Sequence, residues 1–270
     1  MLQKIGEAAL FLKEKGFDNF KTGVVLGTGL NAFINKIEKK ESVTYNDIPH
    51  FPVSFVEFHK GRLITGYIGE KKIIVMQGRF HYYEGHSMQE ITFPIRVMKQ
   101  LGIEQLFLSN AAGGVNPDYK KGDLALIDDH INLLPENPLR GVNDADLGNR
   151  FADMSEPYSH ALNALLSVKA QELRIDVKKG VYASVAGPNL ETRAEYRYIR
   201  NMGADMVGMS TVPEVIVANQ AGIKCAAVSV ITDECDPDNL KPVNIAEIIE
   251  VAAQADTRLS TLFAEVIKNL

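Results

Sequence analysis

The stretch Val24–Asn31, V-V-L-G-T-G-L-N, predicts a short apolar strand, a tight glycine turn and the start of a helix. Gly27 and Gly29 allow backbone conformations that other residues avoid, and they let a ligand approach the main chain closely. Successive N–H groups of such a turn form an anion nest, and the positive end of the following helix dipole adds to it. Thr28 supplies a hydroxyl donor between the two glycines. We therefore predict a phosphate or sulfate cradle at this turn.

The same glycines admit other interpretations. Gly27, Gly29 and Ala32 also satisfy G-x-G-x-x-A, the dinucleotide-binding fingerprint. That fingerprint requires an acidic residue about 20 positions further on, at the end of a second strand. Asp47 lies near this distance, but its neighbours indicate a turn with no completed crossover helix before it. Anion binding is favoured, while a dinucleotide site and a plain strand-to-helix turn stay open.

Composition restricts the class of protein. The chain has 270 residues, of which 46% are hydrophobic and 23% charged, as in ordinary globular enzymes. A net charge of −5 and a pI near 5.7 argue against a nucleic-acid partner, because such proteins usually carry a basic face. Cys225 and Cys235 form neither a disulfide framework nor a zinc site by spacing. With no cleavage signal and no run of about 18 apolar residues, we expect a cytoplasmic protein that does not engage a membrane.

Hydrophobic periodicity predicts strands that alternate with helices along the whole chain. This pattern indicates an α/β class with a largely buried central sheet, in one domain spanning residues 1–270. The segment 132–157 is rich in Asn, Pro, Gly and Asp, and we expect a long functional loop or an interface arm there. The expected helices are 2–15, 88–101, 158–173, 192–202, 213–221 and 244–269, and the expected strands are 22–27, 42–45, 53–58, 62–68, 72–77, 105–109, 124–128, 180–186, 205–209 and 224–231.

A second cluster, Q-G-R-F-H-Y-Y-E-G-H, follows the apolar strand at 72–77. If this run stays extended, Arg79, His81 and Tyr83 share one side of it. A planar guanidinium beside an imidazole and a phenol suggests recognition of anions and hydroxyl groups. The alternative is a solvated loop in which Arg79 pairs with Glu84.

Further clusters follow the later strands. The small residues of S-N-A-A-G-G at 109–114 would let a ligand lie against the backbone at a strand end. Glu191, in V-A-G-P-N-L-E-T, either accepts from an N–H of a base or caps the next helix. Ser210 or Thr211 would cap the helix that Pro213 opens, a position that can serve an anion instead. The acidic run at 232–238 lacks the spacing of a calcium loop, and the histidines show no metal-ligand spacing, so we expect no metal site.

Taken together, these clusters resemble those of the trimeric purine nucleoside phosphorylases over nearly the whole chain. The motifs occur in the family's order: G-T-G-L, H-K-G-R-L, M-Q-G-R-F-H-Y-Y-E-G-H, N-A-A-G-G, N-P-L-R-G-x-N-D, V-A-G-P-N-L-E-T-R-A-E and G-M-S-T-V-P-E. The resemblance implies a mixed, partly barrel-like β-sheet flanked by helices. It also implies reversible cleavage of purine (deoxy)ribonucleosides by inorganic phosphate, with phosphate as co-substrate and no cofactor.

The resemblance also implies roles for individual residues. The phosphate-binding set is Thr28, His59, Arg79, His81, Ala111 through its N–H, and Ser210. The ribose-binding set is Tyr83, Met209 and Phe151, with His59 closing over phosphate and ribose and Phe151 reaching the neighbouring subunit of a homotrimer. The base-binding set is Tyr182, Leu190, Glu191, Met209 and Asp233, and Glu191, Asp233 and His81 are the expected catalytic groups.

Several positions depart from the family pattern. Thr28 stands where many members have Ser, Leu190 replaces the usual Phe, and Ile245 stands where mammalian members have His. Asp233 occupies the position of the base-binding Asn, as in the related methylthioadenosine phosphorylases. A Glu191 carboxylate nevertheless suits the N1–H of hypoxanthine or guanine, and a protonated Asp233 could donate to N7. We therefore expect inosine and guanosine to be preferred, with methylthioadenosine or adenosine phosphorolysis and water-dependent hydrolysis as alternatives.

Overall fold

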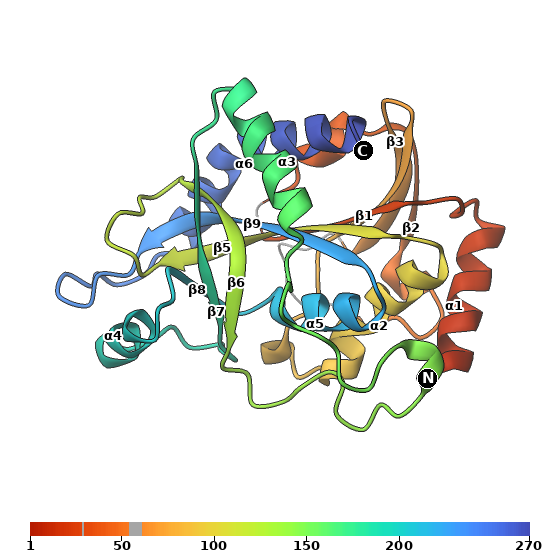
Figure 1. Cartoon of the computed structure of the whole chain (residues 1–270), viewed down its shortest axis with the longest axis horizontal. Helices are drawn as coiled ribbons and strands as arrows, with labels where there is room; N and C mark the ends of the chain where they lie inside the picture. The colour runs from red at the N-terminus through yellow and green to blue at the C-terminus, as the bar shows by residue number, and fades with distance from the viewer. Residues whose placement is uncertain (29, 54–60) are drawn as a thin grey trace.

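The computed structural model describes residues 1–28, 30–53 and 61–270 of the chain (Figure 1). Among these residues the strands are β1 (Thr22–Leu26), β2 (Glu38–Thr44), β3 (Arg62–Ile68), β4 (Lys71–Gln77), β5 (Gln105–Gly114), β6 (Leu124–Asn132), β7 (Val177–Ser184), β8 (Met206–Gly208) and β9 (Lys224–Glu234). The α-helices are α1 (Leu2–Glu14), α2 (Met88–Gln100), α3 (His160–Glu172), α4 (Arg193–Asn201), α5 (Val212–Gln220) and α6 (Ile245–Lys268). Short 3-10 turns are η1 (Ala32–Lys36), η2 (Tyr45–Asp47), η3 (Tyr82–Glu84) and η4 (Ala145–Leu147).

The strands form one mixed sheet in the order β2-β3-β4-β1-β5-β8-β7-β6-β9, and β5 also pairs with β9. This last pairing closes β5, β8, β7, β6 and β9 into a barrel, while β1, β4, β3 and β2 extend the sheet away from β5 (Figure 1). The expected α/β fold with a mixed, partly barrel-like sheet is confirmed.

The first strand is central because it is buried on both faces. β1 pairs in parallel with β4 on one side and with β5 on the other. Val24 belongs to the core beneath α3 and α6, whereas its neighbour Val25 belongs to the core beneath α1, α2 and α5. Alternate side chains of a strand point to opposite faces, so an uninterrupted apolar run is what such a strand requires.

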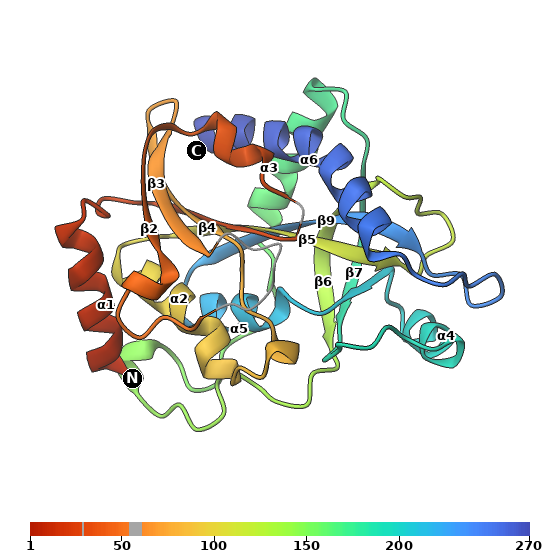
Figure 2. The same ribbon diagram turned by 180° about the vertical axis from the view of Figure 1, so that it is seen from behind.

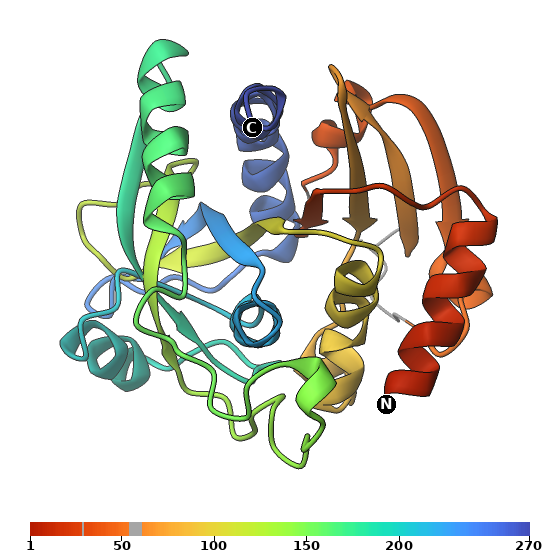
Figure 3. The same ribbon diagram turned by 45° about the vertical axis from the view of Figure 1, so that its right-hand side comes forward.

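Helices cover the sheet from two sides. Figure 2 and Figure 3 show α3 and α6 together on one side, and α1, α2 and α5 on the other. α6 is anchored by Phe263, whose ring packs edge-on against Phe33 of η1 and Phe107 of β5. The C-terminal helix therefore supports both the turn after β1 and the strand beside it.

Most element boundaries agree with expectation to within a few residues, but two strands are longer than expected. β5 does not end at Ser109: it continues through the small residues to Gly114, because β9 and β8 pair with that part of it. β6 likewise extends to Asn132, where β7 still pairs with it. The expected strand at 53–58 lies almost wholly outside the described residues.

The helix expected after the glycine turn is wrong in kind. Only the short 3-10 turn η1 follows β1. A turn this short has little macrodipole to offer an anion, since that dipole grows from aligned peptide units.

In the described part of the chain, no helix has the length and apolar character needed to cross a membrane.

Candidate active site

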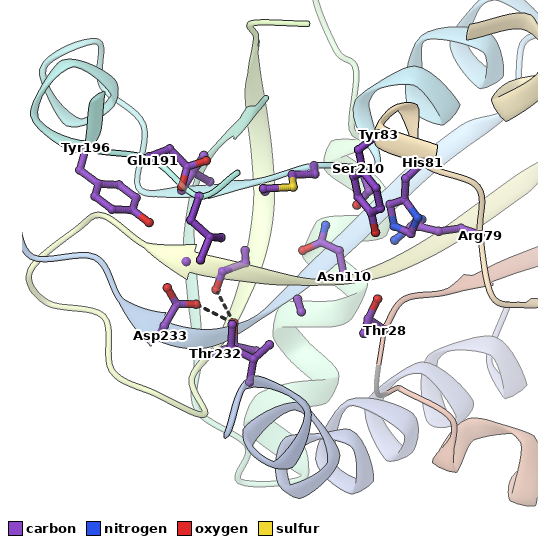
Figure 4. Close-up of a pocket in the computed structure, with 18 residues that line it drawn as sticks. Thr28, Arg79, His81, Tyr83, Asn110, Glu191, Tyr196, Ser210, Thr232 and Asp233 are labelled. Atoms are coloured by element: carbon purple, nitrogen blue, oxygen red, sulfur yellow. Dashed lines mark hydrogen bonds between the residues drawn. The ribbon is translucent and has the colours of Figure 1, made fainter. Parts of the chain in front are cut away.

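Ten of the residues singled out in the sequence line one cavity of about 150 Å³ (Figure 4). They come from the turn after β1, the segment after β4, the middle of β5, the segment before α4, and the ends of β8 and β9. These residues are Thr28, Arg79, His81, Tyr83, Ala111, Leu190, Glu191, Met209, Ser210 and Asp233. Segments that are far apart in sequence therefore converge as expected.

Arg79 is the most deeply buried charged group at the cavity, with 1% of the residue exposed. Its Nε donates to Glu214 Oε1 at 3.0 Å, and its Nη1 donates to the Ser109 carbonyl at 2.6 Å. Its Nη2 is buried and has no hydrogen-bond partner among the residues that the structure describes. A buried N–H of a cation without an acceptor is costly, so this atom marks the place of a ligand acceptor. The alternative pairing of Arg79 with Glu84 is excluded, because Glu214 holds that role.

His81 and Tyr83 lie side by side although the run is not extended. The chain turns through η3, and the two rings stack with their centroids 4.7 Å apart. His81 Nδ1 lies 3.0 Å from Glu84 Oε1. Burial lowers the pKa of His81, against the opposing effect of Glu84, so the imidazole is neutral at pH 7. Burial and then the Glu84 charge raise the pKa of Tyr83 to about 12, which keeps its hydroxyl protonated.

The segment that carries Ser210 is held in an unusual conformation. Thr211 has φ = 71°, a region that β-branched residues rarely occupy, and it is fully buried. Its hydroxyl accepts from Asn110 Nδ2 at 2.8 Å and lies 3.1 Å from the Ser210 hydroxyl. Ser210 or Thr211 was expected to cap the N-terminus of α5, but the N-cap residue Thr211 makes no side-chain capping hydrogen bond. The strained residue instead fixes the Ser210 hydroxyl at the cavity.

The glycine turn is pressed against β5. The Gly27 N–H donates to the Ser109 hydroxyl at 3.1 Å, and a Cβ at Gly27 would stand 2.7 Å from the Ser109 carbonyl oxygen. The first N–H of η1, from Ala32, is taken by the carboxylate of Asp256 in α6. The Asp256 carboxylate therefore neutralises the positive end of η1. The Thr28 hydroxyl is then the group that the described part of the glycine turn offers to the cavity.

The opposite end of the cavity carries carboxyl groups. Glu191 directly precedes Thr192, whose side chain caps α4 in a capping box with Glu195. Glu191 Oε1 is buried and has no hydrogen-bond partner within the described part of the chain. Burial raises the pKa of Glu191, and the charge of Asp233 raises it further. A buried acceptor of this kind indicates a ligand donor.

Asp233 lies near the end of β9, at the same end of the cavity as Glu191 (Figure 4). Its Oδ1 accepts from the Thr232 hydroxyl at 2.9 Å, and its Oδ2 accepts from the Cys235 thiol at 3.1 Å. Both carboxylate oxygens are thus held in place before any ligand binds.

Two of the expected site residues that the structure describes, Tyr182 and Phe151, do not line the cavity. Tyr182 is fully buried, and its hydroxyl accepts from the Ser210 N–H at 3.3 Å, so it supports the Ser210 segment rather than facing a base. Phe151 is 88% exposed and borders a different hollow, with Arg150 over its ring. His59 lies outside the described residues. Ile245 is exposed, and Ile248, one helical turn further on, lines the cavity in its place.

The structure adds site residues that the sequence analysis missed. Asn110, Tyr196 and Thr232 line the cavity, and Glu214 lies behind Arg79. Asn110 and Glu214 lie inside motifs that the sequence analysis quoted. Glu214 is a charged residue in the first turn of an otherwise apolar helix, and this contrast could have indicated a functional side chain. Tyr196 is one of two tyrosines in α4, so no signal distinguished it. Among the described residues, no group of three or more His, Cys, Asp or Glu side chains is placed to hold a metal ion.

Comparisons with known proteins agree with this geometry. Residues 21–268 match the family model described as Phosphorylase superfamily. The chain is 49% identical over 251 residues to purine nucleoside phosphorylase 1 of Bacillus subtilis, covering 93% of each chain. It is 43% identical to the purine nucleoside phosphorylase of Bos taurus, covering 88% of this chain and 85% of that one.

Solved structures show the same fold. Isoform 2 of purine nucleoside phosphorylase from Schistosoma mansoni, in complex with cytosine and ribose-1-phosphate, superposes with a TM-score of 0.95 at 40% identity. The match covers 99% of this chain and 96% of that one. A Schistosoma mansoni purine nucleoside phosphorylase in complex with hypoxanthine has a TM-score of 0.94 at 37% identity, with 99% and 97% coverage.

The Arg79–Glu214 pair makes a direct prediction about stability. Glu214→Ala should lower the free energy of unfolding by about 3–5 kcal/mol, because it leaves a buried guanidinium without a counter-charge. Urea denaturation measures this loss, and added inorganic phosphate should restore part of it by supplying the missing negative charge. Glu234→Ala, which breaks an exposed pair with Lys120, is the control and should change stability by less than about 1 kcal/mol. Equal, small losses in both variants would contradict the role given to Glu214.

Proposed function

The chain belongs to the Phosphorylase superfamily, and we propose from this premise that it catalyses phosphorolysis of purine nucleosides. The products are the free purine base and (deoxy)ribose 1-phosphate. The observation that carries the proposal is a single cavity with an unpartnered buried Arg79 N–H at one end and an unpartnered buried Glu191 oxygen at the other. The first suits an oxyanion and the second suits the N–H of a base.

The phosphate end would hold the attacking nucleophile. Arg79 and the hydroxyls of Thr28 and Ser210 offer donors to a phosphate that lies against β5 at Ala111. Phosphate is a weak nucleophile, so fixing it beneath the anomeric carbon supplies much of the catalysis. Its negative charge also stabilises the cationic, oxocarbenium-like sugar that forms as the bond to the base breaks. Tyr83 and Met209, which line the same cavity, are proposed to contact the ribose, and His59 is proposed to close over it.

The base end would stabilise the leaving group. As the glycosidic bond breaks, negative charge develops on the purine, and a donor near N7 stabilises it more than the ground state. Asp233 in its protonated form is the proposed donor, and ionised Glu191 is the proposed acceptor for N1–H. This assignment favours inosine and guanosine. An Asp at position 233 and an apolar Ile248 near the ribose also suit a methylthioadenosine or adenosine phosphorylase, which is the second candidate.

We also propose that the active unit is one domain, residues 1–270, assembled as a homotrimer. Thr28 near the start of the chain and Ile248 near its end line the same cavity, which supports a single domain. Phe151 is 88% exposed beside a hollow of about 390 Å³ that His130 and Ile216 border, which suits burial against a second copy. In this arrangement Phe151 would complete the ribose site of its neighbour.

Phosphate dependence tests the proposed reaction. Purified protein should cleave inosine only when inorganic phosphate is present, and should release one ribose 1-phosphate for each hypoxanthine formed. Chromatography of the base and a phosphate-release assay on the sugar product measure this ratio. Equal cleavage without phosphate would indicate a hydrolase and contradict the proposal. A strong preference for methylthioadenosine over inosine would select the second candidate.

The trimer proposal predicts an effect of Phe151 on catalysis by a neighbour. Phe151→Ala should raise KM for inosine about tenfold, because a large aromatic contact with the bound nucleoside is lost, and should leave the free energy of unfolding of each chain unchanged. Sedimentation velocity and steady-state kinetics measure assembly and KM. Leu165→Ala, on the exposed side of α3, is the control. A fully active monomer would contradict this arrangement.

A further inference from the structure

The turn that carries Thr28 is held on its two sides by different kinds of contact. On the side of β1, the Gly27 N–H donates to the Ser109 hydroxyl of β5 at 3.1 Å. The Leu30 N–H donates to the Gly27 carbonyl at 3.2 Å, which closes the chain around Thr28 as in a β-turn. The place of the Thr28 hydroxyl therefore depends on Gly27 and on what holds the chain just after Leu30.

Two side chains hold the chain directly after this turn. The side-chain amide of Gln77, at the end of β4, donates to Asn31 Oδ1 at 3.0 Å. The main-chain N–H of Ala32 donates to the Asp256 carboxylate of α6. Hydrogen bonds to an ionised group are roughly twice as strong as those between neutral groups, so Asp256 provides the stronger of these two restraints.

Asp256 is a buried carboxyl group, with 4% of the residue exposed. Its second oxygen accepts from the Ser260 hydroxyl, one helical turn further on, at 2.8 Å. Burial raises the pKa of this carboxyl group, while the hydrogen bonds from the turn and from Ser260 oppose that effect. A buried carboxylate is costly unless hydrogen bonds compensate it, so its contact with Ala32 is a requirement of the packing.

The helix α6 also holds the segment after the turn by an apolar contact. Phe263 lies seven residues after Asp256, and side chains at this spacing share one face of a helix. The Phe263 ring packs edge-on against Phe33 of η1, with 6.5 Å between the ring centroids. One face of α6 thus supplies both a polar and an apolar anchor to this segment. The apolar anchor should keep α6 and η1 packed together when the polar one is removed.

The negative charge of Asp256 excludes a direct role in binding an anion. A carboxylate repels a nearby phosphate, and the Ala32 N–H that an anion would use is already taken. What Asp256 supplies is a fixed position for the chain that follows Leu30. Because the turn closes between Gly27 and Leu30, that position also restrains the Thr28 hydroxyl at the cavity.

We propose that Asp256 is a positioning residue for phosphate binding, which holds the turn through the Ala32 N–H so that the Thr28 hydroxyl donates to the anion. The inference rests on the proposed function in one respect, namely that inorganic phosphate occupies the end of the cavity that Arg79 and Thr28 line. It adds to that function a side chain of α6 that stands outside the described lining of the cavity.

Two substitutions of Asp256 separate its hydrogen bond from its charge. Asp256→Ala removes the acceptor of the Ala32 N–H, whereas Asp256→Asn keeps an acceptor oxygen and removes the charge. The Kd for inorganic phosphate should rise about tenfold in Asp256→Ala, as expected when one hydrogen bond to a charged ligand is lost. It should stay within about threefold of the wild type in Asp256→Asn, because the turn keeps its anchor.

Titration calorimetry with inorganic phosphate measures these Kd values without turnover. In steady-state kinetics, KM for phosphate should follow the Kd, while KM for inosine at saturating phosphate should change by less than about twofold. The controls are Ser260→Ala, which removes the other partner of Asp256, and Glu250→Ala, which removes an exposed acid of the same helix. Both should leave the Kd within about twofold. Unchanged phosphate affinity in Asp256→Ala, an equal rise of both KM values, or an asparagine variant as weak as the alanine variant would overturn the proposal.

A double-mutant cycle tests the route through Thr28. Thr28→Ala removes the hydroxyl, so adding Asp256→Ala to it should weaken phosphate binding by less than about twofold more. A further loss of about tenfold would show that Asp256 acts through another group and would overturn the proposal. Asp256→Ser, whose side chain is one bond shorter, replaces the alanine variant if that variant does not fold.

Phosphate-dependent cleavage of inosine by the wild type is assayed in parallel. Its absence contradicts the proposed function, whereas intact cleavage with unchanged phosphate affinity in Asp256→Ala contradicts the role of Asp256 alone.

Discussion

The packing around the cavity depends on how the positive charge and the N–H donors of the buried Arg79 are satisfied. Arg79 has 1% of its surface exposed, and its donors must be satisfied within the protein or by a ligand. Glu214 of α5 accepts a hydrogen bond from the guanidinium, and the Ser109 carbonyl of β5 accepts another. Both α5 and β5 must therefore pack close to the end of β4, where Arg79 lies. Nη2 is buried without a partner among the described residues, and Arg79 lines the cavity. The requirement to bury this charge and the requirement to bind an anion are therefore met by the same packing.

The two ends of the cavity are built differently. The phosphate end is set by main-chain packing, in which the Gly27 turn, Thr211 and β5 leave little freedom. The base end is set by side chains from the segment before α4 and from β9, such as Glu191 and Asp233. One end can thus stay rigid for the chemistry common to all nucleosides, while the other selects among bases.

Much of this site could be predicted from the sequence, because motifs at strand ends converge once the strands are adjacent. The clusters after β1, β4, β5, β8 and β9 were found one by one in the sequence, and their assignment to one common site came from the resemblance to the purine nucleoside phosphorylases. The sequence could not show whether the N–H at Ala32 was available to an anion, because that N–H donates to Asp256, more than two hundred residues further along the chain. Tyr182 was expected to face the base, and its contact with the Ser210 N–H could not be foreseen in the same way, nor could the contact of Cys235 with Asp233. Hydrogen bonds between residues that are far apart in the chain produce no periodic pattern in the sequence.

The central claim is that the unpartnered Arg79 donor binds inorganic phosphate, and a phosphate titration of the free protein by calorimetry tests it most directly. The double variant Arg79→Met, Glu214→Gln leaves no buried charge uncompensated. It should bind phosphate at least about a hundredfold more weakly than the wild type, since it loses charge-assisted hydrogen bonds. Arg96→Met, which replaces a buried arginine that pairs with Gln220 away from the cavity, should bind as the wild type does. Phosphate affinity that is equal in all three proteins would contradict the account.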